Sequence, residues 1–489
     1  MPNDLRSHAT GLSAALALGA AGALAACVTI DPPPLEDELQ AAQSPPHIEP
    51  RRSLAITEQP ILQRFPLERV LSQLIATSGV TGLTPTALFQ QGWDVFNPGP
   101  GLGAGPHCDD TIHPELGTVL NGFPYSCRPA PAEGSQASCD PFAAGSNCAY
   151  IPIGLFMRFD LAPEDGRHCG EYRIVYAKAS GRTQALNRNL VILEAAARNP
   201  HVNQGLRGCK KLVQAFAQLS AEPDLTARAD LLEDIYFDGY REFDPVVQWS
   251  NFGDNPLGAG QIRTNQFMQP DAPRVWSLRE LKLRKVCGAT CTLQLQPVTA
   301  KVNPFGPLFA DDAAPTPFQL ELADQLPTLT GATAGSIGLR VSDVYNSGQS
   351  QAAGAVPESQ FATHFAPPGA ATSTFRNELT TRLASLGSTL TPDEVVARAQ
   401  AMSCAGCHRF SNNAPIGGGL VWPPSLGFVH VSERDADLEV VDGVVRYKLS
   451  IALTDHFLPD RASLVASYLT DLPRPVRPAD APIGNRWSH

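Results

Sequence analysis

The sequence predicts an α+β body with disulfides, followed by a mainly α C-terminal domain with an inserted β-hairpin. Three observations lead to this prediction. Between 53 and 310, short apolar runs rich in β-branched and aromatic residues alternate with stretches of helical period. Eight cysteines are spread through the same region. After 375, helical patterns flank an Asp442-Gly443 dipeptide between two valine-rich runs, which is a strong hairpin signal.

Residues 1–26 have the pattern of an export signal. A short polar start is followed by an Ala/Leu/Gly-rich stretch that ends in Leu24-Ala25-Ala26-Cys27. This ending resembles the lipobox of bacterial lipoproteins, which implies that the Cys27 thiol is lipidated and anchors the chain to a membrane. An ordinary signal peptide or a short anchor helix is the alternative. Val28 replaces the aspartate that commonly retains such lipoproteins at the inner membrane, which favours the outer membrane, facing the periplasm or the exterior.

The composition indicates a folded chain and excludes some partners. Hydrophobic residues make up 43% and charged residues 17%, which is enough apolar material for a core. The formal net charge of −11 argues against nucleic acid, because binding phosphates needs a basic surface. No apolar run of about 18 residues follows the N-terminus, so we expect no membrane-spanning helix in the mature protein. Residues 27–52 are proline-rich and polar, which predicts a semi-rigid tether.

Cysteine usage fits an oxidising compartment. Of the 11 cysteines, Cys27 is assigned to the lipid, and Cys404 and Cys407 to the motif described below. The remaining eight predict up to four disulfides, one of them a local pair. They are Cys108, Cys127, Cys139, Cys148, Cys169, Cys209, Cys287 and Cys291. The alternative is a metal site that combines some of them with His107, Asp109, His113 or His168, although the paired ligands of zinc ribbons are missing.

We expect the body at 53–310 to contain both helices and buried strands. Apolar residues at helical spacing mark 61–74, and Thr84-Pro85 is a typical helix start. Further helices are expected at 212–219 and 225–236, and strands at 150–160, 171–177, 190–194 and 291–302. Residues 311–374 form an Ala/Gly/Pro-rich connection that we expect to be extended or loosely packed.

Charged residues within the apolar strands are the most functional-looking feature of the body. Burying them without partners would cost several kcal/mol. They therefore predict either a buried ion-pair network or a ligand site, formed by Arg158, Asp160, Glu171 and Arg173. The polar segment 260–268 could line a cleft. The sequence contains no nucleophile elbow, phosphate loop, dinucleotide fingerprint or HExxH motif, so we assign no catalytic residue.

The C-terminal domain, 375–489, carries the clearest chemical motif. Residues 391–394 (TPDE) have the form of a capping box with proline at the first helical position. The helix that starts there leads into 404–408 (CAGCH). Two thiols three positions apart can add to the two vinyl groups of a porphyrin, and the following histidine then lies under the iron. A dithiol redox pair is the alternative, but that motif follows a strand and opens a helix.

The segment from about 391 to 473 resembles a class I cytochrome c domain. The resemblance implies one covalent haem c, attached at Cys404 and Cys407 with His408 as an iron ligand, and a role in electron transfer. No methionine follows the motif to serve as the second ligand, which is a departure from the family. His430 or His456 could take that place, or the iron could be open on that side.

The remaining features of this domain both match and depart from the family. A helix is expected at 375–386, with Gly387 ending it. The residues at 460–472 fit the C-terminal helix that packs across the first helix in the family. The hairpin expected at 438–449 does not belong to a purely helical cytochrome.

These features together predict an envelope lipoprotein with one haem c that passes electrons to or from a partner protein in the cell envelope. One alternative is a mono-haem oxidoreductase with a substrate pocket in the body. Another is a surface recognition protein whose haem motif is incidental or unoccupied. The body itself resembles only uncharacterised bacterial envelope proteins, which implies no activity.

Overall fold

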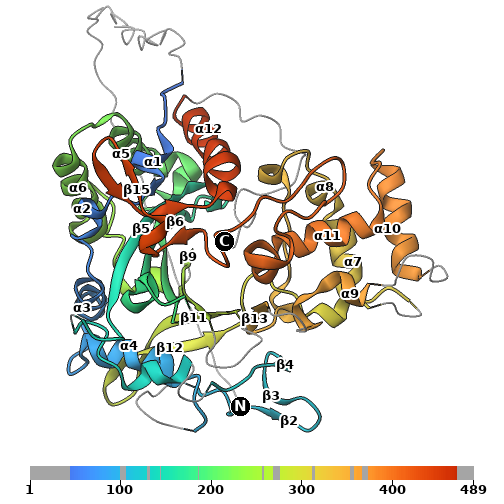
Figure 1. Ribbon diagram of the computed structural model, residues 1–489, viewed down its shortest axis with the longest axis horizontal. Coiled ribbons are helices and arrows are strands. Elements are labelled where there is room, and N and C mark those ends of the chain that lie inside the picture. Colours follow the sequence, from blue (N-terminus) through green and yellow to red (C-terminus); the bar gives the residue numbers. More distant parts are fainter. Residues whose placement is uncertain are drawn as a thin grey trace, which may run out of the picture. The chain divides into compact units, whose positions relative to one another are not determined.

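An antiparallel sheet of eight strands lies at the centre of the fold (Figure 1). The computed structural model describes residues 45–99, 106–128, 133–143, 145–185, 187–255, 258–267, 276–310, 314–352, 357–365 and 373–470. The expected signal peptide, Cys27 and most of the expected tether therefore lie outside the described residues. The chain from Pro45 onward belongs to one compact unit.

The sheet runs in the order β1-β5-β6-β7-β10-β11-β12, and β13 pairs with the part of β11 that β12 does not reach. The bounds are β1 (Ala55–Ile56), β5 (Tyr150–Arg158), β6 (His168–Lys178), β7 (Asn189–Arg198), β10 (Gln261–Phe267), β11 (Trp276–Cys287), β12 (Cys291–Val298) and β13 (Gln349–Ala352). The four strands predicted in the body are confirmed as β5, β6, β7 and β12. The apolar pattern did not predict β10 and β11, because polar and charged residues alternate along both.

The two faces of the sheet have different neighbours, since side chains alternate along each strand. Tyr172 and Tyr176 of β6 lie on the face that helices cover. The Tyr172 ring centre is 5.4 Å from that of Phe216, and the Tyr176 hydroxyl donates to the Phe65 carbonyl at 2.9 Å. The intervening Arg173 lies on the opposite face, which lines a cavity.

Helices of the N-terminal half flank the sheet (Figure 1). Their bounds are α1 (Pro50–Ser53), α2 (Gln59–Leu62), α3 (Leu67–Ser78), α4 (Pro85–Asp94), α5 (Lys210–Ala221) and α6 (Leu225–Glu233). The one helix expected at 61–74 is two helices, because Pro66 disfavours helical backbone at the residue before it and becomes the N-cap of α3. Thr84 caps α4 as predicted, its hydroxyl accepting from the Ala87 amide.

The C-terminal half supplies a second group of helices. They are α7 (Pro317–Asp324), α8 (Leu326–Leu329), α9 (Phe361–His364), α10 (Thr374–Ser385), α11 (Pro392–Met402) and α12 (Leu458–Leu469). The residues at 311–374, expected to be extended or loosely packed, contain α7, α8 and α9 and contribute β13 to the main sheet. Gly387, with a φ of 64°, ends α10 as predicted.

Short strands complete the described structure. They are β2 (Ile112–His113), β3 (Gly117–Leu120), β4 (Phe123–Pro124), β8 (Asp254–Asn255), β9 (Gly258–Ala259), β14 (Val431–Ser432), β15 (Glu439–Val441), β16 (Val444–Arg446) and β17 (Lys448–Leu449). The predicted hairpin is confirmed as β15 and β16. Its two turn residues have φ values of 52° and 76°, as a type I′ turn requires.

The C-terminal segment packs closely against the body. Ring centres of Phe159 and Tyr468 lie 4.5 Å apart, so α12 contacts the end of β5, whereas the family resemblance implies packing across α11. Arg188, just before β7, forms a bidentate ion pair with Glu433 at 2.7 Å, and both side chains are buried. Charged groups taken out of water in this way hold the two parts of the chain in one arrangement.

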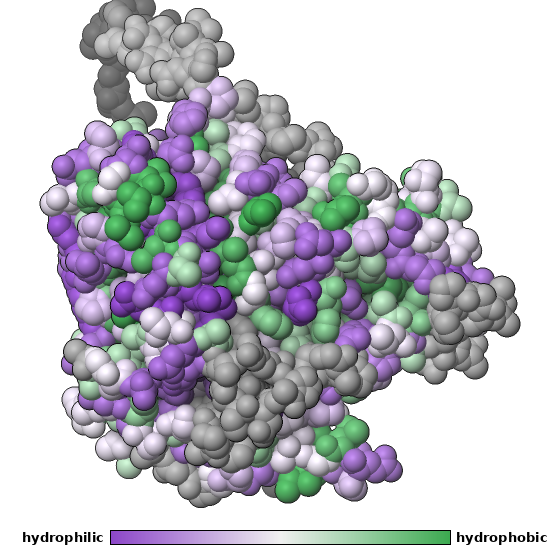
Figure 2. Space-filling model, viewed as in Figure 1, coloured by the Kyte–Doolittle hydropathy of each residue, from purple (hydrophilic) through white to green (hydrophobic). Residues whose placement is uncertain are grey.

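The fold is therefore mixed α/β with several disulfides, in agreement with the coarse prediction. The pairs are Cys108–Cys127, Cys139–Cys148, Cys169–Cys209 and Cys287–Cys291. This pairing replaces the alternative metal site, and the described residues contain no group of three or more His, Cys, Asp or Glu side chains that could hold a metal ion. Hydrophobic residues on the face drawn in Figure 2 form small separate patches. Among the residues described, no helix is long and apolar enough to cross a membrane.

Candidate cofactor site

The sheet and the C-terminal segment enclose a cavity of about 790 Å³, counting its open mouth. The sheet contributes alternate side chains of β5, β6, β7, β10 and β11, several of them apolar, such as Phe156, Ile192 and Leu278. The C-terminal segment contributes Cys407, His408, His430, Leu453, Phe457 and Arg461. The motif predicted to bind a cofactor therefore lines a cavity that it shares with the body.

The capping box predicted at the start of α11 is confirmed. The Thr391 hydroxyl accepts from the Glu394 amide, and the Glu394 carboxylate accepts from the Thr391 amide. The helix does not run on through the motif as expected, because Ser403 is extended, with a ψ of 161°. The Ser403 hydroxyl then accepts from the Gly406 amide at 3.1 Å and starts a new helical turn that carries the motif.

Two further residues fix the position of the motif. Gly406 has no room for a side chain, because a Cβ atom would lie 1.6 Å from the carbonyl oxygen of Gln400. This contact explains the glycine. Arg398 is buried and donates to the carbonyls of Leu329, Gly331, Ile416 and Gly417 at 2.8 to 3.0 Å. It thereby links α11 to the loops on either side of it.

Cys404 and Cys407 are buried and are the free cysteines among those described. Burial raises the pKa of each thiol to about 12. The Ser350 hydroxyl of β13 accepts a hydrogen bond from the Ala405 amide of the same turn at 3.0 Å. Both thiols are therefore protonated at neutral pH and held on the sheet side of the motif.

His408 is oriented by a hydrogen bond to the backbone carbonyl of Phe428, a residue with a strained backbone conformation. Its Nδ1 donates to the oxygen of Phe428 at 2.8 Å, and Phe428 has a φ of 75°, a region that bulky residues rarely adopt. This bond places the lone pair of the neutral ring on Nε2, the arrangement of a metal-binding imidazole. Burial lowers the pKa of His408 to about 4. The ring stacks on Trp276, with ring centres 4.7 Å apart.

His430 lies beside the motif, whereas His456 does not. The ring centres of His430 and His408 are 4.8 Å apart. Nδ1 of His430 is 2.8 Å from the Ser450 hydroxyl, and burial holds the pKa of His430 well below its usual range. His456 is not among the residues that line the cavity, although its neighbours Leu453 and Phe457 are. Of the two methionines of the body, the structure describes one, and it does not line the cavity. Met157 lies on the helix-covered face of the sheet, and Met268 lies outside the described residues.

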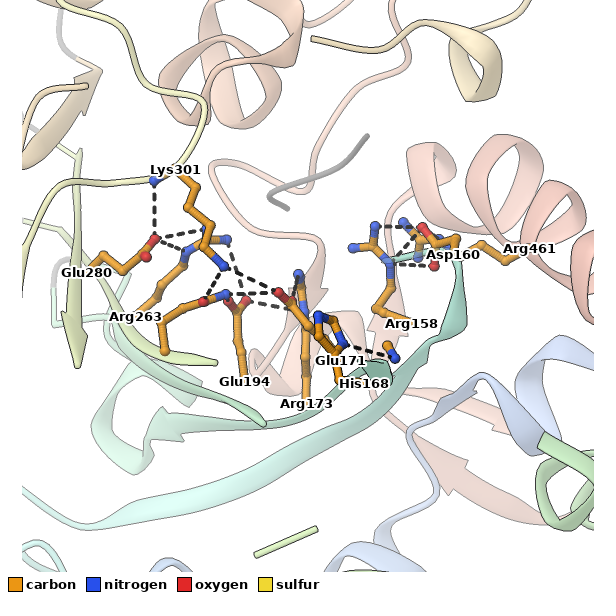
Figure 3. Close-up of polar contacts among 12 residues, drawn as sticks. Arg158, Asp160, His168, Glu171, Arg173, Glu194, Arg263, Glu280, Lys301 and Arg461 are labelled. Atoms are coloured by element: carbon orange, nitrogen blue, oxygen red, sulfur yellow. Dashed lines mark hydrogen bonds and ion pairs between the residues drawn. The ribbon is translucent and has the colours of Figure 1, made fainter. Parts of the chain in front are cut away.

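The predicted network of buried charges is confirmed, and it forms part of the cavity wall (Figure 3). Arg158 binds Asp160 through two nitrogens at 2.8 and 2.9 Å, and Arg173 binds Glu171 at 2.8 Å. The network extends beyond the four residues that were predicted. It continues through Glu194, Arg263, Glu280, Lys301 and Arg461.

The sequence predicted Arg158, Arg173 and the polar segment 260–268, but it did not predict Arg461 or the neighbouring Trp276. Arg263 and Asn265 of that segment line the cavity, as expected for a cleft. Trp276 and Arg461 gave no local signal, because an isolated tryptophan or arginine in a strand or helix has many structural uses. Trp276 stacks on His408 and Arg461 contacts Asp160 only because segments far apart in the chain lie side by side in the fold. The detectable sign was the alternation of charged with apolar residues in β11.

A covalently attached haem fits the residues around the cavity. The free thiol of Cys407 and the neutral rings of His408 and His430 line this space together with apolar side chains and four guanidinium groups, while the Cys404 thiol is buried and is not among the lining residues. Two imidazoles on one iron have ring centres roughly 6 Å apart, because each metal–nitrogen bond is ~2 Å. The separation of 4.8 Å between His408 and His430 is shorter, so the two rings would have to move apart to hold one iron between them.

Comparisons with known proteins give no further assignment. No family model matches the chain, and neither a curated protein nor a solved structure is significantly similar to it.

Proposed function

We propose that this chain is an envelope electron-transfer protein with one haem c, attached through Cys404 and Cys407 and ligated by His408. The observation that carries the proposal is the position of the motif. Its cysteines are free and buried while the other described cysteines are paired in disulfides, and its Cys407 and His408 line a cavity between the sheet and the C-terminal segment. Haem, when bound, supplies reversible one-electron exchange at iron.

The protonation of the thiols argues against a dithiol redox pair. Redox-active CxxC pairs use a thiol whose pKa is lowered toward or below neutrality, since the thiolate is the nucleophile. Burial does the opposite here and raises both pKa values to about 12. Thioether formation removes the titrating group altogether and suits a buried site.

The chain's own residues would tune the bound group. His408 is held in one tautomer by the Phe428 carbonyl and in one orientation by the Trp276 ring. His430 is the candidate for the second ligand, and its Nδ1 contact with Ser450 would hold the ring in place. A second imidazole fills the coordination shell, which favours electron transfer over binding of peroxide or oxygen.

We further propose that Cys27 is lipidated and tethers the folded chain to a membrane of the cell envelope, with the outer membrane favoured. The lipobox-like residues 24–27 and the disulfides both support an exported chain. The redox partner would then be another protein of the envelope. Incorporation of labelled palmitate into wild type and its absence in Cys27→Ala would test the anchor.

Expression with the cytochrome c maturation machinery tests the main proposal. We expect a pyridine haemochrome spectrum of haem c and a reversible one-electron couple in spectroelectrochemistry. The Cys404→Ala and Cys407→Ala variants should each lose the two-thioether spectrum. Absence of haem from correctly folded, disulfide-bonded wild type would contradict the proposal, and a haem that binds peroxide in the resting protein would favour the oxidoreductase alternative.

A further inference from the structure

Arg461 is a buried guanidinium that lines the cavity. It lies on α12, and its side chain is 8% exposed. Among the described residues its ion-pair partner is Asp160, at 3.6 Å, which is longer than a hydrogen bond. A guanidinium has five N–H donors, and burying them is costly unless they meet acceptors. The position of Arg461 therefore calls for an acceptor on the cavity side.

Asp160 is poorly suited to satisfy Arg461 because it is already engaged. It accepts two short hydrogen bonds from Arg158, which also lines the cavity (Figure 3). Two guanidinium groups thus flank one carboxylate at this corner. Burial, together with the nearby charge of Arg158, lowers the pKa of Arg461 to about 9.

The other end of the charged wall is different. There Arg173 contacts Glu171 and Glu194, and Arg263 contacts Glu194 and Glu280. With Lys301, which lies 3.7 Å from Glu171, three cations meet three carboxylates there, so that end is balanced and offers no advantage to a further anion. The attraction for an anion is concentrated at the corner formed by Arg158, Asp160 and Arg461.

We propose that Arg461, together with Arg158, forms a carboxylate-binding subsite in the cavity wall. Guanidinium and carboxylate groups match in geometry, and a buried pair is stronger than one in water. The inference rests on the proposed function in one respect, because the nearest source of a carboxylate is a propionate of the bound haem. A free small carboxylate entering the same cavity has the same chemistry.

The first experiment compares haem-loaded wild type with Arg461→Gln, Arg461→Lys and the control Arg434→Gln, which removes a charge from an exposed position. Resonance Raman spectroscopy reads the propionate bending band, and the pH dependence of the reduction potential reads propionate ionisation. For Arg461→Gln we expect a shifted bending band. We also expect the acid dissociation constant of the propionate to fall at least tenfold. Arg461→Lys should retain most of the effect of the charge, and Arg434→Gln should resemble wild type.

The second experiment identifies the source of the carboxylate. Succinate is titrated calorimetrically into haem-loaded wild type and into a Cys404→Ala/Cys407→Ala variant, each with and without Arg461→Gln. A haem propionate in the subsite predicts succinate binding only to the haem-free protein, whereas a free ligand predicts binding to the loaded protein. In either case Arg461→Gln should weaken binding at least tenfold.

The proposal is overturned when folded Arg461→Gln leaves the Raman band, the propionate ionisation and the succinate affinity as in wild type. Failure of haem attachment is a separate result that contradicts the proposed function. The succinate titration of the haem-free protein still decides the subsite in that case. Melting curves of each variant identify loss of folding, and Arg461→Lys provides the conservative comparison.

Discussion

The Sγ atom of Cys407 lies 3.4 Å from Nε2 of His430, a histidine 23 positions further along the chain. The contact joins the attachment motif to the residue that precedes β14. It brings a second imidazole to the same cavity wall as His408. The residues proposed for haem attachment and the candidate second ligand therefore lie close together in the fold.

Replacing His430 tests this arrangement. In haem-loaded wild type we expect six-coordinate, low-spin iron in both oxidation states. His430→Ala should give five-coordinate, high-spin ferrous iron that binds carbon monoxide, because the second imidazole is removed. Optical and electron paramagnetic resonance spectra measure the change. His456→Ala is the matched control and should keep the wild-type spectra, and the reverse pattern would assign the ligand to His456.

The ion pair between Arg188 and Glu433 should be needed for stability. Removing one partner of a buried pair costs about 3 to 5 kcal/mol, because a charge stays behind in a dry site. We expect this loss for Glu433→Gln in chemical denaturation. The exposed pair of Arg182 and Asp435 is the control, and Asp435→Asn should cost less than about 1 kcal/mol. Similar losses of unfolding free energy for both variants would show that the buried pair does not stabilise the packing of the C-terminal segment.

His168 should make stability depend on pH. Burial lowers its folded pKa from 6.5 to about 4, so the unfolded chain binds a proton that the folded chain does not. The stability is complete above pH 6.5 and falls as the pH drops from 6.5 toward 4, by about 2 to 3 kcal/mol. His168→Asn keeps an acceptor for the Gly170 amide and should flatten the profile in that window. Parallel profiles for the two proteins would contradict the assignment.

The disulfides should differ in their contribution to stability. Cys169 and Cys209 are 40 residues apart, whereas Cys287 and Cys291 are 4 apart. In the chain-entropy account a longer closed loop gives more stabilisation, about 4 kcal/mol for the first pair and about 2 kcal/mol for the second. Paired Cys→Ala variants, followed by thermal and chemical denaturation, measure the difference. A larger loss for the short loop would contradict it.

The sequence predicted local structure well and the assembly poorly. Capping boxes, the Asp442-Gly443 turn and the glycine after α10 depend on neighbouring residues, and the structure confirms them. β10 and β11 were missed because polar and charged side chains, some of them paired across strands, interrupt the apolar pattern of both. An arginine in β10 is recognisable as a wall residue only once Glu194 and Glu280 are placed beside it.

The same limit applies to the candidate site. The motif at 404–408 and the two histidine candidates were visible in the sequence, since their chemistry depends on residue type and spacing. The stacking of Trp276 on His408 depends on long-range pairing that no local pattern encodes. The choice between His430 and His456 likewise required the position of β14 relative to the motif.

Intact-protein mass spectrometry under denaturing conditions tests the central claim most directly. The chain is expressed with the cytochrome c maturation machinery, unfolded, reduced and weighed beside the Cys404→Ser/Cys407→Ser variant. Wild type should retain the mass of one haem and the variant should have the mass of the polypeptide with its lipid alone. Wild type that carries no added haem mass, with its four disulfides formed before reduction, would contradict the account.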